Sequence, residues 1–171
     1  DSITYSDDTA LFNIDATSGE VADTPAESET GTYTVTVTCN DGTNSTQSSF
    51  TYIINDGTSP TYASLSNNAS TVTQTNGAVN WSVSLADGVG LKTYTFSFNN
   101  SGSFVNDSAV TISGTSRLVN VTKTITAAGG SSVCARFHFN DTSGNSAATA
   151  NSCFTVKLVS ANNIPTAPTI I

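Results

Sequence analysis

Two stretches of this 171-residue chain carry the same pattern, and they constrain its fold more than any other feature. In residues 33–54 and 133–158, an alternating apolar and polar segment leads into an Asn-Asp turn and then into a second alternating segment. Alternation with a period of two is typical of half-buried β-strands, and two such strands around a turn form a hairpin. A hairpin that recurs after roughly 100 residues indicates two β modules in tandem. No segment keeps a helical period over three turns, so we predict an all-β chain.

The same pattern divides the chain into four parts. Residues 1–56 form a first module, 57–60 a linker, 61–158 a second module and 159–171 an extended tail. The linker contains a glycine that permits a turn and Pro60, which stiffens the entry to the second module. Seven alternating segments in the second module favour a sandwich of two sheets. The first module is short for a self-sufficient sandwich, so we expect it to be incomplete.

Both modules resemble the immunoglobulin-like and cadherin-like repeats of archaeal and bacterial cell-surface proteins. In the first module the resemblance lies in the apolar residues Leu11, Phe12 and Ile14, the Thr-Ser-Gly turn at 17–19 and GTYTVTVTCNDG at 31–42. In the second it lies in LADGVGLKTYTFSFNNSGSFVND at 85–107 and FNDTSGNSA at 139–147. The resemblance implies two tandem immunoglobulin-like β-sandwich domains. Such repeats begin with one or two further strands, so the first domain is expected to lack its N-terminal strand or strands.

The end of the chain, NNIPTAPTII, looks like the linker and first strand of a following repeat. One interpretation is that it completes the first module of a neighbouring copy, which would assemble a head-to-tail extracellular filament or pilus-like fibre. The alternative is a repeat segment of a large cell-surface adhesin or S-layer-associated protein. The predicted donor strand is Ile164, Pro165, Thr166, Ala167, Pro168, Thr169, Ile170 and Ile171.

A third interpretation, a carbohydrate-binding accessory module, requires aromatic side chains aligned on an exposed face. Trp81, Tyr94, Phe96 and Phe98 instead alternate toward the interior of their strands, so we rank this function lowest.

The charge of the chain is −8 and is unevenly placed. Residues 1–58 hold ten of the thirteen acidic residues and neither Lys nor Arg, whereas the remainder holds all five basic residues. Without a basic face to neutralise phosphates, binding to nucleic acid is disfavoured. The asymmetry favours head-to-tail contact between copies, or is simply a soluble acidic surface. No stretch has the length of a membrane span.

Three cysteines allow one disulfide and one free thiol. Cys134 and Cys153 face each other in the second hairpin when its turn is centred on 143–144. Directly opposed residues have Cβ atoms about 4.5–5.5 Å apart, which is close enough to bridge with modest adjustment. We therefore predict this disulfide and an extracellular, oxidising location at the cell surface. Cys39 shares a face with the apolar residues of its strand, which favours a buried free thiol over an intermolecular bridge.

Seven Asn-x-Ser/Thr sequons are possible acceptors of N-linked glycans. Asn80 and Asn120 fall on outward positions of predicted strands, and the other five fall in predicted loops. Ordinary surface asparagines are the alternative. The sequons are Asn44, Asn68, Asn80, Asn99, Asn106, Asn120 and Asn140.

Catalytic and metal-binding residues are few. The only histidine, His138, is expected on the outer face of its strand without a nucleophile and an acid beside it, so we predict no enzyme and no cofactor. Oxygen-rich loops suit calcium, but no EF-hand or DxNDN linker pattern is present. A solvated acidic surface, not a metal site, is therefore predicted at Asp7, Asp8, Asp15 and Glu20.

Overall fold

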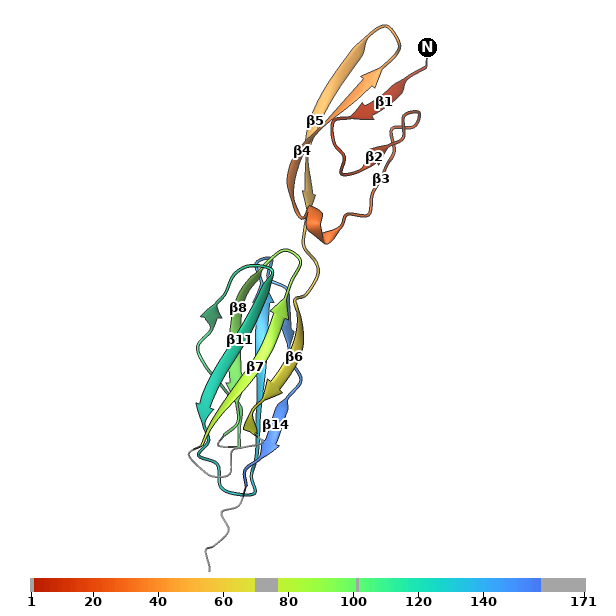
Figure 1. The fold of residues 1–171 in the computed structure, drawn as a ribbon. Helices are drawn as coiled ribbons and strands as arrows, with labels where there is room; N and C mark the ends of the chain where they lie inside the picture. Colours follow the sequence, from red (N-terminus) through yellow and green to blue (C-terminus); the bar gives the residue numbers. More distant parts are fainter. Residues whose placement is uncertain (1, 70–76, 101, 158–171) are drawn as a thin grey trace, which may run out of the picture.

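The computed structural model describes residues 2–69, 77–100 and 102–157 and is all-β, as predicted. Apart from the short 3-10 turn η1 (Glu27–Glu29), the regular elements in these ranges are strands. The strands form two groups that lie end to end and are joined by an extended segment (Figure 1). Among the strands described, none of those within residues 4–54 pairs with any of those within residues 61–155. Within the described ranges, no helix is long and apolar enough to cross a membrane.

The second group, here called the second module, is a sandwich of two antiparallel sheets. One sheet has the order β11-β7-β6; the other has the order β10-β8-β12-β13, with β9 also beside β8 and β14 also beside β12. The strands are β6 (Thr61–Asn67), β7 (Ala78–Ala86), β8 (Leu91–Phe98), β9 (Val105–Asn106), β10 (Val110–Thr111), β11 (Ser116–Thr124), β12 (Ser132–Asp141), β13 (Ser146–Ala148) and β14 (Ser152–Thr155).

The core of the second module follows from strand alternation. Every second residue of β7 and β12 is buried, because successive side chains of a strand point to opposite faces. Trp81 is fully buried, and its ring lies 5.6 Å from Phe96 and 5.4 Å from Phe98, measured between ring centroids. The predicted inward orientation of these aromatic side chains is confirmed. They fill the space between the two sheets and do not form an exposed binding face.

The first group, here called the first module, is a single sheet with one small ribbon beside it. The sheet has the order β1-β4-β5, and β2 and β3 form a separate two-stranded ribbon. The Phe12 ring meets the Tyr52 ring edge to face, with centroids 5.3 Å apart. The sequence did not predict β1, because its polar residues give no apolar alternation. The strands are β1 (Thr4–Asp7), β2 (Asn13–Ile14), β3 (Val21–Ala22), β4 (Gly31–Asn40) and β5 (Ser45–Ile54).

Candidate functional site

The sheet of the first module has an open edge along β5. All ten residues of this strand pair with β4, from Ser45 opposite Asn40 to Ile54 opposite Gly31, without a bulge. In the described part of the chain, no strand lies along the other side of β5. Its backbone groups on that side are therefore available to a further strand.

The opposite edge of the sheet is better closed. β1 lies beside the end of β4, where it pairs with Val37–Asn40. Just beyond this pairing, the Asp8 carboxylate accepts a hydrogen bond of 2.8 Å from the Thr36 backbone N–H. This bond lowers the pKa of Asp8 below its ordinary value. Asp8 thus satisfies an edge group that a strand would otherwise pair.

Apolar side chains near the open edge are only partly covered. Phe50 pairs with Val35 and so shares its face, but Phe50 is 43 % exposed while Val35 is fully buried. Ile53, on the other face of β5, is 57 % exposed. Phe12, just before β2, packs against Tyr52 on the same face of β5 as Phe50, whereas Phe50 itself stays largely open to solvent.

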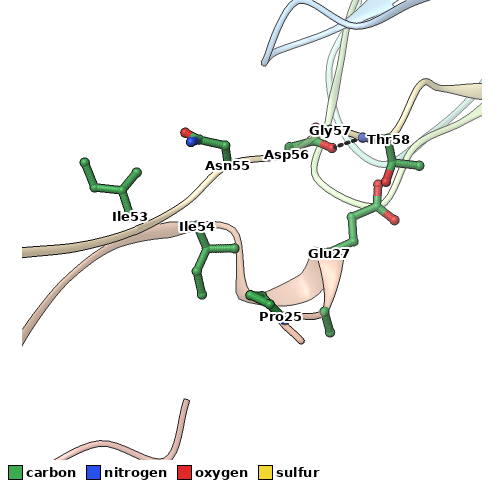
Figure 2. A pocket seen from close by; sticks show the side chains of 9 residues that line it. Pro25, Glu27, Ile53, Ile54, Asn55, Asp56, Gly57 and Thr58 are labelled. Carbon is green, nitrogen blue, oxygen red and sulfur yellow. Dashed lines mark hydrogen bonds between the residues drawn. The ribbon is translucent and has the colours of Figure 1, made fainter. Parts of the chain in front are cut away.

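The junction between the modules contains a pocket of about 470 Å³. Figure 2 shows Glu27 extending from η1 of the first module toward Asp56 and the linker residues Gly57 and Thr58. One carboxylate oxygen of Asp56 accepts a hydrogen bond from the Thr58 N–H at 2.9 Å, and the Asp56 carbonyl accepts one from the side-chain amide of Asn145. The first bond shapes the connecting segment locally, and the second attaches it to the second module.

A third carboxylate, from the second module, lies close to the carboxylates of Glu27 and Asp56. Asp87 lies in the loop between β7 and β8, and its Oδ1 atom accepts hydrogen bonds from the backbone N–H groups of Val89 and Gly90. Carboxylate oxygens of Glu27, Asp56 and Asp87 lie within 4.8 Å of one another. Two like charges 4 Å apart repel by about 4 kcal/mol at an effective dielectric constant of about 20. These are the carboxylates of the described ranges whose positions suit a shared cation.

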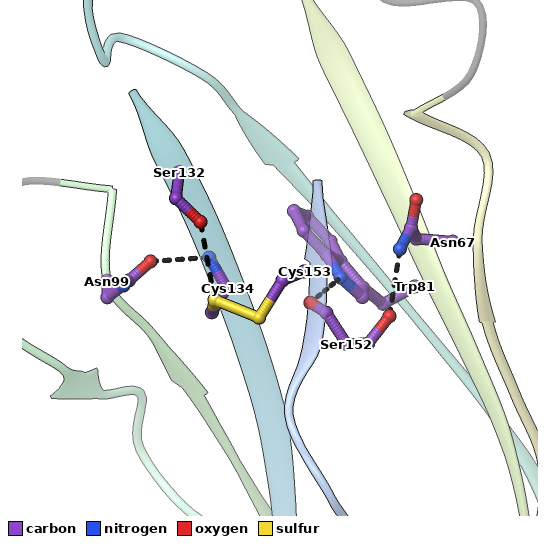
Figure 3. Close-up of a disulfide and its surroundings, with 7 residues drawn as sticks. All are labelled: Asn67, Trp81, Asn99, Ser132, Cys134, Ser152 and Cys153. Carbon is purple, nitrogen blue, oxygen red and sulfur yellow. Dashed lines mark hydrogen bonds between the residues drawn. A yellow bond between two sulfur atoms is a disulfide. The ribbon is translucent and has the colours of Figure 1, made fainter. Parts of the chain in front are cut away.

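A disulfide joins Cys134 of β12 to Cys153 of β14, the pair that the sequence analysis selected. The two residues are direct partners in the register, with Cα atoms 4.1 Å apart. Around them, Asn99 accepts a hydrogen bond from the Cys134 N–H, and the neighbouring Ser152 carbonyl accepts one from the Trp81 indole (Figure 3). The disulfide therefore links strand β14 to β12 next to the buried Trp81. Cys39 is free, but it is half-buried and not buried as predicted.

The predicted centre of the second hairpin was wrong near the turn. That centre would place His138 opposite residue 149, whereas β13 pairs it with Ala148. Farther from the turn, β14 pairs with β12 and places Cys153 opposite Cys134. This register is shifted by one residue relative to the pairing of β13 with β12. The break at residues 149–151 supplies the extra residue, as a β-bulge does. The cysteines meet because of this interruption, not because the hairpin is uniform.

The acidic residues of the first module that were considered for calcium mostly hold local turns. Asp7 accepts a hydrogen bond from the Thr9 N–H, and Asp15 accepts two, from the N–H groups at positions 17 and 18. The bonds to Asp15 lower its pKa below the ordinary value. Glu20 is exposed. Asp8 bonds to the edge of β4 at Thr36, and the four side chains do not converge on a common point.

The sequons differ in accessibility. Asn44, Asn68, Asn106 and Asn120 are exposed, and Asn80 is half-buried. Asn99 and Asn140 are half-buried, and their side-chain oxygens accept cross-strand hydrogen bonds from Cys134 and Thr93. Two were wrongly placed in loops, because Asn106 belongs to β9 and Asn140 to β12. Glycosylation at all seven positions remains a prediction.

His138 lies on β12 opposite Thr95 of β8 and Ala148 of β13. Burial lowers its pKa below the ordinary value of 6.5, and the positive charge of Arg136 lowers it further. The residues of the surface hollow around it bring hydroxyl and amide groups near the imidazole but no carboxylate and no thiol. This lining is Thr93, Thr95, Phe139, Asn140, Ser146 and Ala147.

Sequence reasoning missed the junction carboxylates. Asp56 was placed at the end of the first module, and neither Glu27 nor Asp87 was singled out as a site residue. One signal was available: two Asp-Gly pairs, at 56–57 and 87–88, precede and follow strands that meet at the same end of the second module. The predicted donor strand, residues 164–171, lies outside the described residues. No model of a known protein family matches the chain, and no curated protein matches its sequence.

Proposed function

We propose that this chain is a structural subunit of an extracellular filament or pilus-like fibre. Its two modules are immunoglobulin-like domains, and the first is completed by the tail of a neighbouring copy. The tail, residues 164–171, adds to the free side of β5 as a donor strand of eight residues. Repetition of this contact builds a head-to-tail polymer. The observation that carries the proposal is the unprotected edge of β5.

Edge strands of monomeric proteins are normally protected by charged residues, proline or bulges. The β5 sequence STQSSFTYII has no charged residue and no proline, and its register with β4 is continuous. Nine of its ten residues are exposed or half-buried. A long, regular and uncharged edge of this kind is a template for a further strand.

The small core of the first module also supports the proposal. In the described residues, its buried apolar side chains are only Phe12, Val35 and Ile54, whereas fifteen form the core of the second module. A strand laid along β5 would cover Phe50 and add apolar contacts where the module has few. Burial of apolar area contributes about 25 cal/mol per Å².

The chemistry of the tail suits such an edge. Eight extended residues span about 26 Å at about 3.3 Å per residue, and the ten residues of β5 span about 33 Å. The two prolines, Pro165 and Pro168, lie on opposite sides of an extended strand, since their positions differ in parity. Whichever side meets β5, one amide donor of four is lost and three remain. Isoleucines at both ends of the tail provide apolar side chains to cover the exposed ones.

Negative-stain microscopy of the full chain and of a variant without residues 164–171 tests this assembly. We expect fibres from the full chain and monomers from the truncated chain. A synthetic peptide of residues 164–171 should then bind the truncated chain, as measured by calorimetry. The matched control is the same peptide with Ile164→Asp and Ile170→Asp, which keeps the backbone donors but places charge against the apolar face.

Two results would contradict the mechanism. Fibres that persist without the tail would show that another contact assembles the chain. Equal binding of both peptides would show that the apolar side chains of the tail are not recognised. If the full chain is monomeric and the peptide binds to nothing, a repeat within a longer cell-surface array becomes the better description.

A further inference from the structure

The three junction carboxylates come from three separate parts of the fold. Glu27 belongs to η1 of the first module, Asp56 directly precedes the linker, and Asp87 belongs to the loop between β7 and β8 of the second module. Their oxygen atoms nevertheless lie within 4.8 Å of one another. In the described ranges no lysine or arginine forms an ion pair with these three carboxylates. The ion pair found there joins Lys123 to Asp107.

Each of these carboxylates leaves one buried oxygen without a hydrogen-bond partner. Asp56 and Asp87 are both only 9 % exposed, and their Oδ2 atoms have none; nor does Oε1 of Glu27. In both aspartates the other oxygen, Oδ1, holds the local loop through backbone N–H groups. The loop bonds thus fix the two side chains while their second oxygens remain free in the shared cluster. A buried charged oxygen without a partner is costly, so this arrangement favours a positive charge bound among the three carboxylates.

We propose that the junction binds one calcium ion through Glu27, Asp56 and Asp87. Carboxylate oxygens are the ligands that hard cations prefer, and Ca²⁺ accepts six to eight of them in irregular geometry at about 2.3–2.6 Å. Two oxygens bound to one Ca²⁺ at that distance lie at most about 5.2 Å apart, which accommodates the observed spread of 4.8 Å. The adjoining pocket leaves room for water molecules as the remaining ligands. The cluster has no histidine or cysteine, so it does not suit zinc.

A cation at this point would connect the two modules directly. The contact is already close: a Cβ atom on Gly88 would lie 2.5 Å from the Glu27 carboxylate. The first module therefore rests its acidic side chain on the backbone of the second, and glycine leaves the space for it. Bound Ca²⁺ would hold η1, the linker and the β7–β8 loop together, and so restrict the angle between the modules.

Calcium binding is measured by isothermal titration of the chelator-treated full chain with CaCl₂. We expect one site with a dissociation constant on the order of 10⁻⁴–10⁻³ M, the range of extracellular calcium modules. MgCl₂ is titrated in parallel and should bind more weakly, since Mg²⁺ requires nearly ideal octahedral geometry. Small-angle scattering of the same samples should show that Ca²⁺ narrows the distribution of distances between the modules.

Two substitutions remove a single charge without removing the loop bonds. Asp87→Asn and Asp56→Asn keep the Oδ1 acceptor and replace the free oxygen, and each should weaken Ca²⁺ binding at least about tenfold. The matched control is Asp41→Asn. Asp41 also precedes a glycine, and its Oδ1 atom also accepts two backbone N–H groups, but it lies in the exposed turn between β4 and β5. This control should bind Ca²⁺ like the unmodified chain.

Gly88→Ala tests the contact without changing any charge. Its Cβ atom would displace the Glu27 carboxylate, so binding should weaken although all three acids remain. The near-ultraviolet circular dichroism of each variant shows whether it is folded. The proposal is overturned if the unmodified chain binds no Ca²⁺ at about 10 mM, well above the expected dissociation constant. It is also overturned if folded Asp87→Asn binds as tightly as Asp41→Asn. Neither outcome depends on whether the tail donates a strand.

Discussion

Asp141 illustrates how one side chain can hold a hairpin in place. It ends β12 with no exposed surface, and its Oδ1 atom accepts hydrogen bonds from the backbone N–H groups of residues 143, 144 and 145. These donors have no strand partner in the turn, so the carboxylate replaces a set of backbone bonds. The turn therefore depends on an acceptor at this position more than on the residues at its tip.

Replacement of Asp141 by alanine should destabilise the second module. Each lost hydrogen bond contributes about 1 kcal/mol, so we expect the free energy of unfolding to fall by about 2–4 kcal/mol. Asp141→Asn keeps the Oδ1 acceptor and should cost less. Urea unfolding followed by fluorescence checks this, because the only tryptophan, Trp81, lies in the core of that module. A loss below about 0.5 kcal/mol in the alanine variant would contradict the role given to Asp141.

His138 offers a direct test of burial, since it is the only histidine. Its pKa should lie below 6.5, because burial and then Arg136 disfavour the charged ring. The unfolded chain then binds more protons than the folded chain, so stability should fall as the pH falls below about 6.5. A proton NMR titration of the imidazole measures the pKa. Arg136→Gln should raise it, and a value at or above 6.5 in the unmodified protein would contradict the assignment.

At the scale of elements, the disulfide should be a main support of the edge strand β14. It closes a loop with a sequence separation of 19 residues, for which the loss of chain entropy is about 3 kcal/mol. The double variant Cys134→Ala, Cys153→Ala should therefore lower the free energy of unfolding by about 2–4 kcal/mol, measured by Trp81 fluorescence. The third cysteine provides the control, because Cys39 is free and belongs to the other module. Cys39→Ala should leave this transition unchanged.

Strands with clear alternation could be predicted from the sequence, and strands held by context could not. The residues of β7 and β12 alternate strictly, so their buried faces follow from a period of two, and the alternating sequence of β4 likewise predicts a strand, although Val35 is its one buried residue. β1 is polar and exists because it pairs with the end of β4. The shift between β13 and β14 was also hidden, since an inserted residue changes register without changing composition.

At the scale of the whole molecule, the junction cluster escaped sequence reasoning for a topological reason. Glu27, Asp56 and Asp87 are each roughly thirty residues apart, and no local motif connects them. They meet only because η1, the linker and the β7–β8 loop lie at the ends of the modules that face each other (Figure 1). Acidic residues that lie closer to one another in the sequence, such as Asp7 and Asp15, instead accept hydrogen bonds from the backbone of their own turns.

The unequal cores predict that the two modules unfold separately. Among the described residues, three buried apolar side chains stabilise the first module and fifteen the second. Calorimetry of the truncated chain without residues 164–171 should therefore show two transitions, the first module melting at the lower temperature. Two perturbations identify them. The cysteine double variant should lower only the second transition, and the 164–171 peptide should raise only the first, because a ligand stabilises the state that binds it. A single transition that both perturbations shift would show that the modules unfold as one unit. In that case the first module would not have the low stability expected of a module that accepts a strand along the open edge of β5.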